Sequence, residues 1–200
     1  TFSRKAAEQL RDRITGRLGR TLSTNLCSTF HSFAYGLVRA HGPKGLYDEP
    51  LRLLTAPEQD VVLQRLLTHE SESVRWPASL DRAVGTRGFA REVQAVLARA
   101  REKGLDPEDL VALGRVEGDP AWVAAGEFME QYLTVLDHES ALDYPELITR
   151  AVAFAETPEV RARLRRQYSW VFVDEYQDTD PAQVRLLRAL AGDGRNLVVV

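Results

Sequence analysis

Apolar residues in the first 42 positions recur at the spacing of α-helices. Residues 4–18 are predicted to form one helix, with Ser3 as its N-cap and with Gly16 and Gly19 ending it. Residues 25–28 are a candidate short strand, and a second helix is predicted from residue 30 to Gly42. The apolar positions are Ala6, Ala7, Leu10, Ile14 and Leu18 in the first helix and Phe30, Phe33, Ala34, Leu37 and Val38 in the second.

The middle of the chain, residues 53–138, has a helical pattern throughout. One helix is predicted to start at Pro57 and run through Leu67, a second to cover residues 89–103, and a third residues 121–137. Glycines punctuate the stretch, and no internal repeat is found in it. We therefore predict an all-helical unit.

The last part of the chain changes from helical to α/β character. Helices are expected over residues 146–155 and 160–166. Residues 170–173 (Trp-Val-Phe-Val) are β-formers without polar alternation, which is typical of a strand buried on both faces of a parallel sheet.

A second strand is expected after one more helix. Asp180 and Pro181 supply an N-cap and a first-turn proline for a helix through Leu190, and residues 197–200 begin another buried apolar run. The order strand, helix, strand indicates a right-handed crossover in a parallel sheet.

Composition narrows the class of protein. With 44% hydrophobic and 28% charged residues, the chain has the balance of a globular domain. It has no apolar run of the roughly 20 residues that a membrane-spanning helix needs, and it begins without the apolar core of a secretory signal. The single cysteine, Cys27, is more typical of a small buried residue than of a reactive thiol. We expect a cytoplasmic protein without a membrane partner.

Charge is distributed unevenly along the chain. The net charge of −3 combines +6 over residues 1–44, −8 over residues 45–140 and −1 over residues 141–200. Local fields attract phosphates, so the first segment is the one basic enough to suggest a polyanion partner. The alternative is that its arginines form the solvated face of a helix.

Two adjacent acids, Asp174 and Glu175, follow the first predicted strand. Carboxyl ends of strands line the ligand crevice of open α/β sheets, so this pair is a candidate site. The aspartate could bind Mg²⁺ on nucleotide phosphates, and the glutamate could orient or deprotonate a water. The alternative is that the strand simply ends in acids where it meets solvent.

Three segments together resemble a known family. Residues 174–180 (DEYQDTD) resemble the DExQD box, also called motif II or Walker B, of the UvrD/Rep/PcrA-like superfamily-one DNA helicases. Residues 1–7 (TFSRKAA) resemble motif Ia, and residues 29–33 (TFHSF) resemble motif Ib. Arg4 replaces the usual Asn and Tyr176 the common Phe. Residues 88–110 are similar to the actinobacterial RecB/AdnB-like branch, which often carries a nuclease.

The resemblance implies an α/β fold: a partial RecA-like parallel sheet of the P-loop NTPase type with a mainly α-helical inserted domain. Residues 1–44 and 141–200 would be parts of the first RecA-like motor domain, and residues 45–140 the helical insert. The implied function is an ATP-dependent DNA helicase that couples ATP hydrolysis to 3′-to-5′ translocation on single-stranded DNA and to duplex unwinding, in DNA repair or recombination.

The resemblance also implies residue roles. Asp174 would coordinate Mg²⁺, Glu175 would act as the base on water, and Gln177 would sense the γ-phosphate of ATP. Phe30 and His31 also allow structural interpretations, as a core aromatic and as a capping or buried histidine; the same core interpretation applies to Phe2. The implied DNA-binding residues are Phe2, Arg4, Lys5, Thr29, His31 and Ser32.

A phosphate-binding GxxxxGK[ST] loop does not occur in the 200 residues, and position 1 is not Met. We therefore expect a fragment of a longer helicase that, alone, binds ATP and Mg²⁺ poorly and is inactive. Two alternatives stay open: a non-catalytic helical interaction module, and part of a RecB-like helicase-nuclease.

Overall fold

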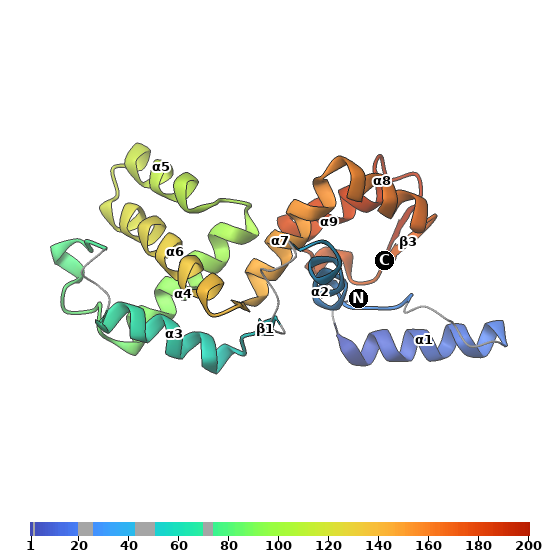
Figure 1. The fold of residues 1–200 in the computed structure, drawn as a ribbon, viewed down its shortest axis with the longest axis horizontal. Coiled ribbons are helices and arrows are strands. Elements are labelled where there is room, and N and C mark those ends of the chain that lie inside the picture. Colours follow the sequence, from blue (N-terminus) through green and yellow to red (C-terminus); the bar gives the residue numbers. More distant parts are fainter. Residues whose placement is uncertain (2, 20–25, 43–50, 70–73) are drawn as a thin grey trace. The chain divides into compact units, whose positions relative to one another are not determined.

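In the computed structural model, the described residues are 1, 3–19, 26–42, 51–69 and 74–200. The chain divides into two compact units. Residues 1–42 and 147–200 form one, called here the split unit, and residues 43–146 form the other, called the helical unit. Residues 141–146 cluster with the helical unit, and the assignment of residues 1–44 and 141–200 to a motor domain and of residues 45–140 to an insert stays a prediction. Figure 1 shows the elements of both units.

The split unit combines helices with one small parallel sheet. Strand β3 pairs with β4 in parallel, with Val171 opposite Leu197 and Val173 opposite Val199. Its elements are α1 (Arg4–Leu18), α2 (Phe30–His41), most of α7 (Tyr144–Glu156), α8 (Pro158–Gln167), β3 (Val171–Val173), the 3₁₀ turn η2 (Tyr176–Asp178), α9 (Pro181–Ala191) and β4 (Leu197–Val199).

Local capping chemistry sets the helix ends in the split unit. The Ser3 hydroxyl accepts from the Ala6 backbone N–H at 3.0 Å, which confirms the predicted start of α1. Gly19, with φ of 62°, ends the helix in the left-handed conformation that glycine adopts readily. Gly16 lies inside α1, so the prediction that it helps to end the helix was wrong, because the helix continues until Gly19 bonds back to Thr15.

The strands are less buried than the sequence predicted. Phe172 is 71% exposed and Trp170 61%, whereas Val173 is buried. Val199 in β4 is 45% exposed. The expectation of strands buried on both faces was therefore wrong. Alternate residues of a strand face opposite sides, so β3 is covered on the side of Val173 and exposed on the side of Phe172, whereas β4 exposes the consecutive residues Val198 and Val199. The parallel pairing was predicted correctly, and the handedness of the crossover stays a prediction.

Residues 26–28 do not form the predicted strand, and Asn25 lies outside the described residues. A strand requires a neighbour to complete its backbone hydrogen bonds. Within the described ranges, β3 and β4 pair only with each other, so residues 26–28 form no strand pairing with either of them.

Arginine side chains tie the helices of the split unit together. Arg165 of α8 donates from Nε to the carbonyl of Ala189 at 3.0 Å, near the end of α9, where a cation is favoured by the helix dipole. Arg185 of α9 pairs through two hydrogen bonds, of 3.1 and 2.7 Å, with Glu156 at the end of α7. These contacts fix α9, and with it the segment that precedes α9.

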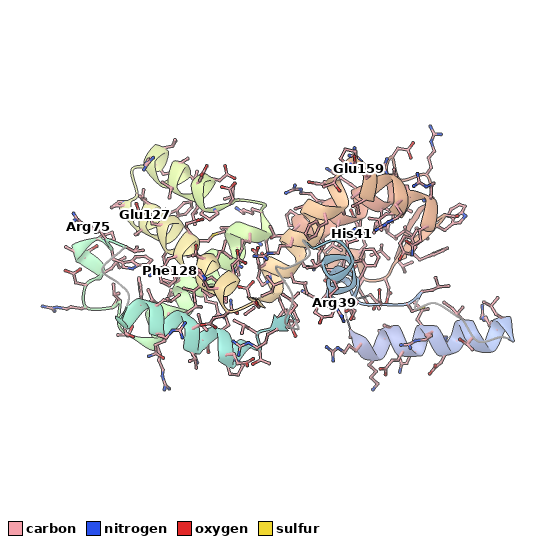
Figure 2. All side chains as sticks on the ribbon, viewed as in Figure 1. Arg39, His41, Arg75, Glu127, Phe128 and Glu159 are labelled. Atoms are coloured by element: carbon pink, nitrogen blue, oxygen red, sulfur yellow. The ribbon has the colours of Figure 1, made fainter. Side chains whose placement is uncertain are left out.

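The helical unit packs its helices around one apolar core. Leu63, Leu66, Leu97, Phe128 and Leu136 are each at most 1% exposed. Figure 2 labels Phe128 on α6. Burial of each such side chain contributes roughly 1.5–3 kcal/mol. The elements of the unit are β1 (Arg52–Leu53), α3 (Ala56–His69), the 3₁₀ turn η1 (Ala78–Leu80), α4 (Arg87–Glu102), α5 (Pro107–Glu117), α6 (Pro120–His138) and β2 (Ala141–Leu142).

Two features of the helical unit were not predicted from the sequence. The unit is not all-helical, because β1 and β2 pair in parallel, with Arg52 opposite Ala141. Strands of two residues are too short to show an alternation of apolar and polar positions. Helix α5 was not predicted as a separate element, although Asp106 and Asp109 form a capping box at its start.

Helices α5 and α6 approach each other closely through glycine. An added Cβ on Gly126 of α6 would lie 2.8 Å from the Val111 backbone nitrogen and 2.9 Å from the Pro107 carbonyl oxygen, both in α5. Gly114 of α5 is similarly close to the Val123 nitrogen, at 2.6 Å. The two helices can therefore lie at this separation only with glycine at these positions.

Candidate functional site

The segment 174–180 leaves the end of β3 and is held there by backbone hydrogen bonds. The Val200 N–H donates to the Val173 carbonyl at 2.9 Å, and the Tyr176 N–H donates to the Val200 carbonyl at 3.0 Å. Asp174 and Glu175 thus follow the carboxyl end of a parallel strand, as predicted. Both residues are exposed, so their carboxylates are accessible to a ligand.

Glu175 has an unusual backbone conformation. Its φ of 57° and ψ of 43° lie in the left-handed region, which is uncommon for a residue other than glycine. Such a conformation costs of order 1–3 kcal/mol and persists only where neighbours enforce it. Here the Asp178 N–H donates to the Glu175 carbonyl at 3.0 Å, and Gln177 Nε2 donates to Glu175 Oε2. The turn therefore brings the predicted base and Gln177 into direct contact.

The first residue of the chain lies beside this segment. The Thr1 hydroxyl donates to Asp174 Oδ2 at 3.3 Å, and the Thr1 nitrogen donates to the Ser28 carbonyl at 3.4 Å. The structure thus brings together residues 1 and 174, which start two of the segments that carry the predicted site, and residue 28, which directly precedes the third. Nothing in the sequence pattern marks Thr1 as a neighbour of Asp174.

The start of α2 is organised by Thr29, which is buried and acts as its N-cap. The Thr29 hydroxyl accepts from the Ser32 N–H at 3.1 Å and donates to Ser32 Oγ at 2.9 Å. Phe30 is 8% exposed and belongs to the core, so its structural interpretation is confirmed. Ser32 is exposed and His31 is half-buried.

His31 and Asp180 influence each other electrostatically. Burial lowers the pKa of His31 below its usual 6.5, and the negative charge of Asp180 opposes this shift. Asp180 Oδ1 also accepts from the Gln183 N–H at 2.7 Å and so caps α9. The start of α2 and the end of the 174–180 segment therefore lie within electrostatic range of each other. The cap of α9 could be predicted from the sequence Asp180-Pro181. The proximity of Asp180 to His31 could not.

The basic helix α1 presents its cations to solvent. Arg4 and Lys5 are exposed in its first turn, and Phe2 lies outside the described residues. Ala7 is the buried residue of α1, while Leu10 is 41% and Leu18 51% exposed. Exposed cations on such a helix are accessible to a polyanion. The same exposure also agrees with the alternative, in which the arginines form the solvated face of a helix.

A magnesium ion fits this site only together with a nucleotide. Among the residues that the structure describes, no group of three or more His, Cys, Asp or Glu side chains could hold a metal ion. Mg²⁺ usually keeps several waters and binds through one or two carboxylates plus substrate phosphates. The exposed Asp174 carboxylate matches that mode, with the Thr1 hydroxyl beside it.

Within the described part of the chain, no helix combines the length and apolarity required to cross a membrane.

Comparison with known proteins gives matches along the whole chain. A family model described as UvrD/REP helicase N-terminal domain matches residues 1–200. The chain is 26% identical to DNA helicase II of Escherichia coli (strain K12) over 202 residues, which cover 100% of this chain and 26% of that protein.

Two further relatives agree. ATP-dependent DNA helicase PcrA of Bacillus subtilis (strain 168) is 26% identical over 201 residues, covering 100% of this chain and 25% of that protein. ATP-dependent DNA helicase UvrD1 of Mycobacterium tuberculosis (strain ATCC 25618 / H37Rv) is 27% identical over 200 residues, covering 98% and 24%. The chain thus spans about a quarter of the length of these relatives.

Proposed function

Because the chain belongs to the family of UvrD/REP helicase N-terminal domains, we propose that it is the part of an ATP-dependent DNA helicase that hydrolyses ATP and grips single-stranded DNA. The motor would translocate 3′ to 5′ and unwind duplex DNA in the cytoplasm. The observation that carries the proposal is the contact of Thr1 with both Ser28 and Asp174, which joins the three segments.

In this proposal, Asp174 would hold the magnesium of a Mg²⁺–nucleotide complex, which would supply positive charge beside the phosphates. Glu175 accepts the proton of the attacking water. Its exposed carboxylate and its hydrogen bond from Gln177 support this role, because the amide fixes the direction in which the carboxylate points. Gln177 would also contact the γ-phosphate of ATP and couple its binding to the DNA-binding residues.

Single-stranded DNA would lie along the starts of α1 and α2. The exposed Arg4 and Lys5 supply cations for phosphates, and Ser32 supplies a hydroxyl. Thr29 would act through the cap that orients Ser32, because its own hydroxyl is buried and already bonded. The electrostatic influence of Asp180 on His31 supports a link between this track and the 174–180 segment.

A larger RecA-like sheet would complete the nucleotide site. Phe172 and Trp170 expose apolar surface on and beside β3, as does Val199 on β4. Such residues are usually buried in parallel sheets, so their exposure supports further strands and helices packing against β3 and β4 in the whole protein. The phosphate-binding loop that residues 1–200 do not contain would belong to that part.

The proposal is tested in the complete protein with Glu175→Gln. This change keeps size and hydrogen bonding but removes the base, so steady-state ATP turnover should fall by about a hundredfold or more while nucleotide binding is largely kept. Asp174→Ala should instead weaken binding of Mg²⁺–ATP. Glu159→Gln, at an exposed position of α8 labelled in Figure 2, is the matched control and should leave turnover unchanged. Near-normal turnover of the Glu175→Gln protein would remove Glu175 from the mechanism.

A further inference from the structure

The helical unit contains a buried group of charges outside the candidate site. Its centre is the Arg101–Asp143 pair, and Arg101 Nη1 also lies 4.0 Å from Oε2 of Glu146, whose side chain is 10% exposed. Arg101 lies in the last turn of α4, and its side chain is 2% exposed. The side chain of Asp143 is 1% exposed. Two parallel hydrogen bonds of 2.8 Å join them, from Nη1 to Oδ1 and from Nη2 to Oδ2. Arg101 Nε donates to the Leu97 carbonyl at 3.2 Å, which fixes the guanidinium on its own helix.

The Asp143 carboxylate accepts three further hydrogen bonds. Gln59 Nε2 of α3 donates to Oδ2 at 2.9 Å, and the Tyr132 hydroxyl of α6 donates to Oδ2 at 3.0 Å. The Glu146 N–H in the first turn of α7 donates to Oδ1 at 2.8 Å. Burial raises the pKa of Tyr132, so its hydroxyl keeps the proton that it donates. One carboxylate therefore collects donors from four helices.

Stability alone does not account for this arrangement. Removing two charges from water costs several kcal/mol each, and replacing a buried pair by apolar residues of similar volume is often neutral or stabilising. A bidentate pair fixes the orientation of the carboxylate, because the planar guanidinium of arginine binds both carboxylate oxygens at once. Here that orientation matters, since Oδ1 also caps a helix.

We propose that Arg101 is a positioning residue that acts through Asp143: it holds the capping carboxylate in place and thereby fixes the first turn of α7 on the helical unit. The chain arrives at Asp143 from β2, where the Leu54 N–H donates to the Leu142 carbonyl at 2.8 Å. The pairing of β1 with β2 thus fixes the chain just before Asp143, and the Arg101–Asp143 pair fixes the first turn of α7 just after it. The inference uses neither nucleotide nor DNA and is independent of the proposed motor function.

The test uses the 200-residue chain and the double variant Arg101→Met/Asp143→Ser. Serine is a good N-cap, so the variant keeps a cap for the Glu146 amide but loses the charge pair that orients it. Hydrogen exchange of the Glu146 amide is compared with that of amides in the middle of α6. Unfolding in urea is followed by tryptophan fluorescence in a Trp170→Phe background, which leaves Trp76 and Trp122, both in the helical unit.

Arg99→Met is the matched control, because Arg99 lies on the same helix and pairs with Glu102 at the surface, at 3.0 Å. We expect the double variant to unfold at higher urea than Arg101→Met alone, because it leaves one buried carboxylate, Glu146, without Arg101 instead of two. Relative to the amides of α6, its Glu146 amide should exchange at least tenfold faster than in the parent chain. Arg99→Met should change neither the urea midpoint nor this exchange rate. The single variant Arg101→Met should unfold at lower urea, since it leaves Asp143 buried without its cation. Unchanged exchange at Glu146 in the folded double variant would overturn the proposal. Failure of the double variant to fold would also overturn it, because the pair would then be needed for folding itself.

Discussion

The hydroxyl of Thr1 lies 3.3 Å from Oδ2 of Asp174, although 173 positions separate the two residues. This contact places the beginning of the basic segment next to the acids that follow β3. In the proposed function, the segment that carries cations for a polyanion would therefore begin beside a carboxylate that binds a metal–nucleotide complex. The two kinds of ligand would then be bound by neighbouring backbone segments, which is what coupling between them requires.

The 200-residue chain by itself should release no measurable phosphate from ATP. Phosphoryl transfer depends on positioning, and Asp174 and Glu175 alone cannot hold the β- and γ-phosphates. The measurement is phosphate release with Mg²⁺, with and without an oligonucleotide. Magnesium-dependent hydrolysis that DNA stimulates would mean that the nucleotide site has been misplaced.

Single-stranded DNA should bind to the same chain with micromolar or weaker affinity, because only a few phosphate contacts are available. Binding should be weaker at about 200 mM than at about 50 mM salt, because each phosphate contact releases counterions. Arg4→Gln/Lys5→Gln should reduce both the affinity and its salt dependence. Arg91→Gln/Arg99→Gln, which removes two exposed arginines from the helical unit, is the control. Fluorescence anisotropy of a labelled strand measures both. Equal losses in the two double variants would show that α1 is not the DNA-binding element.

Gly126→Ala should destabilise the helical unit by about 1–3 kcal/mol, because the new methyl group would overlap backbone atoms of Pro107 and Val111 in α5, which cannot move away as a flexible side chain can. Gly36→Ala in α2 is the control: its Cβ would meet no atom within 4 Å, and alanine favours a helix by about 1 kcal/mol over glycine. Urea unfolding monitored by Trp76 and Trp122 in a Trp170→Phe background measures the first variant, and circular dichroism the second. A Gly126→Ala protein as stable as the parent chain would contradict the close approach of α5 and α6.

The pKa of His31 should lie below 6.5 in an NMR titration of its imidazole, because burial disfavours the charged form. Asp180→Asn keeps a good N-cap for α9 but removes the opposing negative charge, and should lower the pKa of His31 further. The unfolded chain then binds a proton more readily than the folded one, so this histidine costs the folded state stability as the pH falls below 6.5. A pKa at or above 6.5, or one that rises in Asp180→Asn, would show that the imidazole is not desolvated in this way.

Features that depend on residues close together in the chain could be predicted from the sequence. Ser3 starts α1, Gly19 ends it, and Asp180 with Pro181 starts α9, because capping acts over three or four residues. The parallel pairing of β3 with β4 followed from two apolar runs separated by a helix. The segment 174–180 could likewise be recognised from its own residues, while the roles assigned to its side chains remain predictions.

The packing of the folded chain determines which distant residues meet and which apolar residues are covered. Phe172 and Val173 are both apolar, yet one is exposed and the other buried, since the face against which helices pack is not encoded in the strand. The meeting of Arg101 with Asp143, and of Thr1 with Asp174, has no local signature either. Such contacts result from how whole helices and strands pack, and packing energies are summed over many side chains that no short segment contains.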